Sequence, residues 1–243
     1  MEMKPYYTAY ENRYQKVYEA GAERWGHSPD DPELISLLTA WVEKNQLRRK
    51  RIIEFACGEG GAGVILSKLG CIYHGVDIAP SAVEKARATL ENYPNAKVSL
   101  LDMVSQQIDE KYDAALDVMG LHMLVTDSDR ANYLNNAFSC LNSGAPMLFF
   151  RESYRVNAYE GPIASFDYWL ALTGDDYKKP EQRFAECGNN KVEVYIPLVP
   201  ARAKNREGYM REMIEAGFKV NAILEMETNS KIVYSASIYV CKQ

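Results

Sequence analysis

The sequence predicts an α/β fold whose centre is a doubly wound, seven-stranded, mostly parallel sheet that ends in an antiparallel hairpin. Between residues 51 and 152, five short apolar runs alternate with segments of helical periodicity, the order that gives parallel strands with helices on both faces. Two later strands, 218–227 and 232–240, are separated by four residues, too few for a crossover helix. These last strands should therefore pair antiparallel.

Composition limits the classes of protein to consider. A chain of 243 residues with 47% hydrophobic residues can bury the core of one domain, which we expect to span 1–243. The net charge of −5 offers no general attraction for nucleic acid, and we interpret the basic run 48–51 as a solvated strand start rather than an RNA contact. No apolar run approaches the roughly 18 residues of a membrane span, and no signal peptide is visible.

The five cysteines are widely spaced and never form a C-x-x-C pair. This pattern argues against a disulfide framework or a zinc site and favours a reducing compartment. We therefore predict a cytoplasmic protein, a monomer or homodimer, with no metal site, no nucleic-acid partner and no membrane association. Cys57 is interpreted as a small packing residue rather than a nucleophile, because no histidine lies near it in sequence.

Two helices precede the sheet. Tyrosines recur at helical spacing over residues 7–17, and an apolar stripe over 34–41 marks a second helix after a Pro- and Gly-containing turn. Both precede the first strand, so residues 1–47 are predicted to form an N-terminal helical cap. The tyrosine stripe is interpreted as core packing, with closure over a ligand as the alternative.

Strands and helices then alternate. Apolar runs and periodicity predict strands that begin at Arg51 and cover 71–78, 96–102, 112–118 and 145–152, with helices over 62–69, 80–92, 130–141 and 205–217. From 153 to 190 the periodicity is lost in a stretch rich in Gly, Pro and Asp, with one short helix expected around 166–172. We interpret 153–190 as an insertion or lid, and the strand expected over 192–198 as part of it.

The first strand runs into a glycine-rich turn. Gly58, Gly60 and Gly63 match the G-x-G-x-x-G pattern of dinucleotide sites, and Asp77 ends the second strand, where it can accept two ribose hydroxyls. The alternative for Asp77 is a cap of the following helix. Glu54 inside the first strand, an acid after the third strand and the antiparallel ending all argue against a nicotinamide site.

These residues resemble the motifs of class I S-adenosylmethionine-dependent methyltransferases. The stretch from Glu54 to Gly60 resembles the motif acid-x-Gly-x-Gly-x-Gly, with Ala56 in place of the first glycine, and residues 76–86 resemble the second motif. Asp102-Met103 matches the adenine position, and residues 112–124 resemble the strand and loop near the methionine end. The resemblance covers residues 50–151 and, by architecture, the final hairpin. It implies a Rossmann-like methyltransferase fold and an enzyme of the small-molecule branch.

The resemblance also implies roles for individual residues in binding S-adenosylmethionine. The backbone from Ala56 through Gly58 to Gly60 would surround the methionine moiety, and Ala56 is expected to stay extended because alanine tolerates positive φ poorly. The remaining polar and apolar cofactor contacts would be Asp77 at the ribose, Asp102 at the adenine amino group, Ile78 and Met103 on the ring faces, and Glu54 and Asp117 near the ammonium.

Further candidates come from the cap and from strand ends. In related enzymes N-terminal aromatic residues and an arginine close over the cofactor. By this resemblance Arg13 would pair with the methionine carboxylate and Tyr14 would lie beside the sulfonium. The alternative for Arg13 is a position on a solvated helix face. If the acceptor needs a base, the candidates are His122, Asp117 and Glu152, which all follow strand carboxyl ends. A histidine that only stabilises its loop is the alternative for His122.

The predicted function is methyl transfer from S-adenosylmethionine to a small-molecule acceptor. The reaction is an in-line displacement with a neutral leaving group, so orientation and exclusion of water can supply most of the rate, and no catalytic triad is required. Two alternatives stay open: a noncatalytic S-adenosylmethionine-binding protein and an NAD-dependent oxidoreductase.

Overall fold

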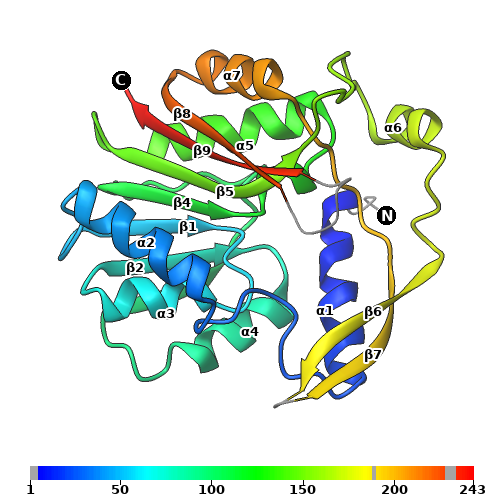
Figure 1. Cartoon of the computed structure of the whole chain (residues 1–243), viewed down its shortest axis with the longest axis horizontal. Helices are drawn as coiled ribbons and strands as arrows, with labels where there is room; N and C mark the ends of the chain where they lie inside the picture. The colour runs from blue at the N-terminus through cyan, green and yellow to red at the C-terminus, as the bar shows by residue number, and fades with distance from the viewer. Residues whose placement is uncertain (1–4, 188–189, 228–233) are drawn as a thin grey trace.

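A seven-stranded sheet with the order β3-β2-β1-β4-β5-β9-β8 forms the centre of the computed structural model, which describes residues 5–187, 190–227 and 234–243 (Figure 1). The strands are β1 (Arg51–Phe55), β2 (Ile72–Asp77), β3 (Ala96–Leu100), β4 (Ala114–Val118), β5 (Pro146–Tyr154), β8 (Phe218–Glu227) and β9 (Tyr234–Lys242). β1 to β5 are parallel, whereas β9 runs antiparallel to both β5 and β8. The predicted fold class is confirmed; the first two residues of the strand expected at 232–240 lie outside the described residues.

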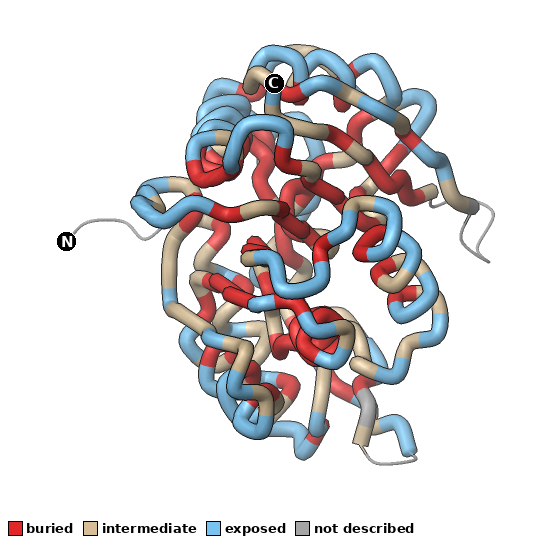
Figure 2. Tube along the Cα trace, turned by 90° about the vertical axis from the view of Figure 1, so that its left-hand side faces the viewer, coloured by how far each residue is buried: buried red, intermediate tan, exposed pale blue. Residues whose placement is uncertain are grey.

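Helices cover both faces of this sheet. α2 (Pro32–Lys44) and α3 (Gly61–Lys68) pack on one face, and α5 (Asp127–Cys140) and α7 (Arg206–Glu215) pack on the other. α4 (Pro80–Thr89) lies along β2 and β3. Because side chains alternate along a strand, Ile53 joins the α5 and α7 side while Ile52 joins the α2 and α3 side. Buried residues, red in Figure 2, accordingly follow the strands and the inner faces of the helices.

The N-terminal segment and a second, two-stranded sheet lie outside this sandwich. After a 3-10 turn at Tyr6–Thr8, α1 (Ala9–Glu19) runs beside the antiparallel hairpin of β6 (Pro180–Cys187) and β7 (Asn190–Pro197), as Figure 1 shows. A small apolar cluster joins them, formed by Val17, Ala22, Ala185, Val194 and Ile196. Within the described ranges, no helix is long and apolar enough to cross a membrane.

The predictions for the segment 153–190 are partly confirmed. The short helix expected around 166–172 is α6 (Phe166–Thr173), and the strand expected over 192–198 is β7. The expectation that 153–190 contains no other regular structure is wrong, because β6 lies within it. The run PEQRFAEC lacks a clear apolar alternation: the exposed face of β6 carries Phe184, whereas Ala185 is the residue that packs toward α1.

Close packing behind the glycine turn makes Gly63 sensitive to substitution. A Cβ added there would lie 2.5 Å from the ring of Tyr73. We expect Gly63→Ala to lower the free energy of unfolding by about 1 to 3 kcal/mol through overpacking, although alanine is the better helix former by about 1 kcal/mol. Urea unfolding measures the difference.

The matched control is Ser67→Ala in the same helix. The Ser67 hydroxyl is buried without a hydrogen-bond partner among the described residues, so its removal should leave the stability unchanged or raise it. A Gly63→Ala protein as stable as the wild type would contradict the close contact between α3 and β2.

Candidate functional site

Five acidic side chains gather at the carboxyl edge of the parallel strands. Glu54 lies in β1, Asp77 ends β2, Asp102 follows β3, Asp117 lies in β4 and Glu152 in β5. All but Asp102 are at most 8% exposed. Parallel strands bring their carboxyl ends to one edge of a sheet, where ligands of open α/β folds bind. The structure therefore brings the predicted acids to one place.

Two adjoining cavities open at this edge. The larger, of about 510 Å³, lies between the glycine turn, α1 and the segment after β7. The site residues predicted from the sequence that line this cavity are Arg13, Tyr14, Glu54, Ala56, Gly58 and His122. The smaller, of about 80 Å³, shares Tyr14 and Ala56 with it and adds Asp77, Ile78, Asp102 and Met103. Gly60, Asp117 and Glu152 line neither of these two cavities; Gly60 is the N-cap residue of α3.

The glycine turn is wound more tightly than the sequence suggested. Ala56 has a φ of 51°, Gly58 of 52° and Gly60 of 79°. The expectation that Ala56 stays extended is therefore wrong, and its left-handed conformation costs about 1 to 2 kcal/mol. The chain must reverse between β1 and α3 within a few residues, which forces these angles.

Asp77 fixes the turn through its carboxylate. Oδ2 accepts the backbone N–H of Gly58 at 2.8 Å, and Oδ1 accepts that of Ala79 at 2.9 Å. Asp77 thus stabilises the start of α4, in line with the alternative that it caps this helix, although the N-cap residue itself is Ala79. A carboxylate oxygen has two lone pairs, so each oxygen retains capacity for a hydroxyl donor from the cavity.

Glu54 is held beneath the turn. The hydroxyl of Tyr73 donates to its Oε2 at 2.5 Å, and burial raises the pKa of Glu54 to about 8. Glu54 points to the α2 and α3 side of the sheet, because Ile53 and Phe55 on either side of it point to the other.

A β-bulge in β5 directs Glu152 toward His122. The register with β9 shifts between Phe149 and Glu152, and Arg151 within the shift has a φ of 57°. Phe150 packs on the α2 side and Arg151 pairs with Glu33 of α2, so the extra residue returns Glu152 to the α5 side. Without the bulge, alternation would place the acid on the wrong face.

Glu152 and His122 form a hydrogen-bonded pair. Oε2 of Glu152 accepts from the backbone N of His122 at 2.7 Å and lies 2.9 Å from its Nδ1. A carboxylate only accepts, so we assign the ring proton to Nδ1, which leaves Nε2 as an acceptor. The ring lines the larger cavity. This hydrogen bond therefore stabilises the loop, which is the structural role given above as the alternative for His122. It also leaves Nε2 available as a base.

Asp117 lies beneath this pair and is fully buried. It accepts the backbone N–H of Gly120 and the hydroxyl of Tyr133, each at 2.6 Å. Burial, reinforced by the negative charge of Glu152, raises the pKa of Asp117 well above its ordinary value. Its position fits support of the loop after β4 better than contact with a ligand.

Arg13 does not lie on a solvated face. Its guanidinium stands over the rings of Trp25 at 5.3 Å and Tyr10 at 5.8 Å, and lines the larger cavity. Its hydrogen bond to the carbonyl of Pro197 is long at 3.5 Å, and the buried Nε has no partner among the described residues. A buried cationic donor without an anion is prepared to bind a carboxylate.

Sequence reasoning missed Glu59, which fastens the N-terminal segment to the glycine turn. The buried carboxylate accepts from the hydroxyl of Tyr18 at 2.7 Å and from the backbone of Trp25 and Gly26. Glu59 occupies a variable position of the glycine motif, so neither spacing nor polarity distinguished it. A second tie joins Glu11 of α1 to Ser81 of α4.

Comparisons with known proteins agree with this geometry. Residues 52–144 match the model of a family described as "Methyltransferase domain". The fold is similar to that of 1,6-didemethyltoxoflavin-N1-methyltransferase from Burkholderia thailandensis, with a TM-score of 0.66 and 11% identity over 100% of this chain and 92% of that chain. It is also similar to magnesium protoporphyrin IX methyltransferase from Synechocystis PCC 6803 (0.64, 12%, 100% of both chains) and to an amino pentose methyltransferase from Micromonospora echinaspora (0.61, 13%, 95% and 97%).

Residues 52–144 thus match a methyltransferase domain, and the whole chain has the Rossmann-like fold of these methyltransferases. The predicted fold is confirmed, and the match lies within the residues that resemble the S-adenosylmethionine-dependent class.

The buried Glu54 makes a prediction about pH. The unfolded chain ionises Glu54 near 4.5 and the folded protein near 8, so its stabilising contribution is complete below pH 4.5 and is lost as the pH rises to about 8. In cofactor-free protein, Glu54→Gln should therefore reduce the fall in unfolding free energy between these pH values, as measured by urea unfolding. Part of the fall should remain, because burial also raises the pKa of Asp77 and Asp117.

The control is Glu43→Gln on the exposed side of α2, which should keep the wild-type pH dependence. An identical fall in the Glu54→Gln protein would mean that Glu54 is already ionised in the folded state.

Proposed function

We propose that this chain transfers the methyl group of S-adenosylmethionine to a small-molecule acceptor. The observation that carries this proposal is the methyltransferase domain with buried acids around a two-part cavity at its carboxyl edge. Similar folds occur in proteins named as methyltransferases of toxoflavin precursors, magnesium protoporphyrin IX and an amino pentose. A cavity of this size suits acceptors of that kind rather than a polymer.

The charge balance of the site favours this cofactor over a dinucleotide. Glu54 and Glu59 line the larger cavity together with Arg13, and Asp77 and Asp102 line the smaller one. S-adenosylmethionine carries two positive charges, on its sulfonium and ammonium groups, and one negative charge, on its carboxylate. The pyrophosphate of a nicotinamide cofactor would instead bring negative charge among buried acids, which is unfavourable in a medium of low dielectric.

The two cavities would divide the cofactor between them. In the smaller, Asp77 would accept the ribose hydroxyls, Asp102 the adenine amino group, and Ile78 and Met103 would contact the ring. In the larger, the residues for the methionine end would be Arg13, Tyr14, Glu54, Ala56, Gly58 and Gly60, with Asp117 supporting the adjacent loop. Two observations support the fit of these residues to the methionine end. The Nε of Arg13 has no partner among the described residues, and a Cβ added at Gly58 would lie 3.0 Å from the hydroxyl of Tyr14.

When bound, the cofactor supplies an electrophilic methyl group and a neutral leaving group. The chain supplies the base: Nε2 of His122 takes a proton from the acceptor, and Glu152 stabilises the imidazolium through Nδ1–H. Met123, Leu198 and Val199 line the same cavity and would exclude water from the reacting atoms.

The surrounding segments complete this proposal. Residues 1–47 would act as a cap on a single domain, 1–243, and the segment 153–190 would serve with β7 as a lid over the acceptor. The protein would work in the cytoplasm, in keeping with its five free cysteines.

Cofactor binding is tested by calorimetry with S-adenosylhomocysteine and NADH. Asp77→Asn keeps the shape of the side chain but loses the charge, so S-adenosylhomocysteine should bind more weakly by about 1 to 3 kcal/mol. Asp109→Asn, at an exposed position, is the matched control and should bind like the wild type. NADH binding in place of S-adenosylhomocysteine would refute the proposal in favour of the oxidoreductase.

Catalysis is tested by the formation of S-adenosylhomocysteine with a panel of phenols, aromatic ring nitrogens and amino sugars. With an active acceptor, His122→Gln should lower kcat by about 100-fold or more because the proton acceptor is lost. The control is His74→Gln. The ring of His74 forms hydrogen bonds with Tyr112 and Ser99 and lines neither cavity. No turnover with any acceptor, despite cofactor binding, would favour the noncatalytic alternative.

A further inference from the structure

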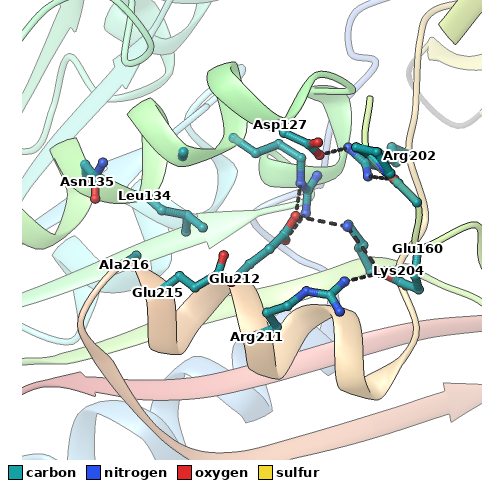
Figure 3. A pocket seen from close by; sticks show the side chains of 14 residues that line it. Asp127, Leu134, Asn135, Glu160, Arg202, Lys204, Arg211, Glu212, Glu215 and Ala216 are labelled. Carbon is teal, nitrogen blue, oxygen red and sulfur yellow. Dashed lines mark hydrogen bonds and ion pairs between the residues drawn. The ribbon is translucent and has the colours of Figure 1, made fainter. Parts of the chain in front are cut away.

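A second cluster of charged side chains lies behind the site, between α5, α7 and the two chain segments around residues 160 and 202 (Figure 3). We call this set the ionic cluster; its members are Asp127, Arg130, Glu160, Arg202, Lys204, Arg211 and Glu212. Ion pairs connect them: Arg130 with Glu212 at 2.7 Å, Arg202 with Asp127 at 2.6 Å, Lys204 with Glu160 at 3.2 Å and with Glu212 at 3.3 Å, and Arg211 with Glu160 at 3.2 Å.

Two arginines of the ionic cluster reach the turn that carries His122. Nη1 of Arg130 donates to the carbonyls of Leu121 at 2.8 Å and Leu124 at 3.0 Å. Nη1 of Arg202 donates to the carbonyl of Val125 at 2.8 Å, and its backbone N donates to that of His122, also at 2.8 Å. Four of the five carbonyls from residue 121 to 125 are thus bound by these two residues.

Neither arginine lines the cavities of the proposed site, and each is 1% exposed. A buried charge pair contributes little net stability compared with apolar packing, so stability alone does not account for this arrangement. Directional binding does account for it. The planar guanidinium of Arg130 presents Nε and Nη2 to Glu212 and Nη1 to the two carbonyls, a division that a lysine ammonium cannot reproduce.

We propose that Arg130 and Arg202 are positioning residues that hold His122 in its orientation toward Glu152 and the cavity. This inference rests on the proposed role of His122 as the base. Glu212 orients Arg130 from α7, and Asp127 orients Arg202 from the start of α5. Nη2 of Arg202 also donates to the carbonyl of Gly161 at 3.1 Å, so the stem of the segment 153–190 is tied to the same turn.

The test is nitrogen NMR of the full chain with ¹⁵N-labelled histidine, which needs no acceptor. The protein has three histidines, so His122 is assigned by comparison with His122→Gln, and His27 and His74 serve as internal references. The wild type should show His122 as a single Nδ1–H tautomer. The charge-conserving variant Arg130→Lys should lose that single tautomer, whereas the reference signals stay unchanged.

The matched control is Arg211→Lys in the same ionic cluster, because Arg211 is half-exposed, pairs with Glu160 and donates to no carbonyl of the turn. Its His122 signals should equal those of the wild type. Arg202→Lys is the second test variant and replaces Arg130→Lys if that protein does not fold. Unchanged His122 signals in a folded Arg130→Lys or Arg202→Lys protein would overturn the proposal.

Kinetics with an active acceptor separate positioning from general destabilisation. As a single substitution, Arg130→Lys should lower kcat and leave the affinity for S-adenosylhomocysteine unchanged. Added to His122→Gln, it should lower kcat no further. An equal loss in both backgrounds would also overturn it. If His122→Gln itself keeps full activity, the proposed base is wrong, whereas the NMR result still decides whether the arginines hold the ring.

Discussion

The concentration of buried carboxylates at one edge of the sheet is the constraint on which the rest of this structure depends. Each acid must find donors from a neighbouring element: Glu54 from Tyr73, Asp77 from the glycine turn, Asp117 from Tyr133 and Glu152 from His122. These hydrogen bonds bind loops to strands. The chemistry of the site and the order of its loops therefore have the same physical origin.

Backbone strain occurs beside three of the same acids; the other non-glycine residues with positive φ in the described ranges, Gln46 and Arg49, lie before β1. Ala56 lies two residues after Glu54, Met119 two residues after Asp117, and Arg151 directly before Glu152, and all three have positive φ. Non-glycine residues in this conformation cost free energy and persist only where surrounding contacts hold them. Here the strain turns the chain so that a strand residue can be buried while the next loop reaches the cavity.

The sequence predicted what depends on local pattern. Strand and helix periodicity gave the sheet, and the glycine turn with Asp77 and Asp102 marked the edge where the cavities lie. It did not predict β6, which lacks apolar alternation, or the left-handed Ala56, which responds to the tight reversal. The contacts of Glu59 and Arg130 were also beyond prediction, since they join residues 34 and 82 positions apart. Such pairings depend on the assembled fold, and no local spacing encodes them.

α1 lines part of the larger cavity. Arg13 and Tyr14 face the cavity from α1, and the cap is held over the glycine turn by Glu59 and beside α4 by Glu11. Tyr7 and α2 pack into the two cores that flank the sheet, whereas α1 itself is held by these polar contacts and by the small apolar cluster with the hairpin. Segments held in this way belong to the less stable part of a protein. The position of Arg13 and Tyr14 at the cavity therefore depends on these few contacts, whereas the sheet is stabilised by its own two cores.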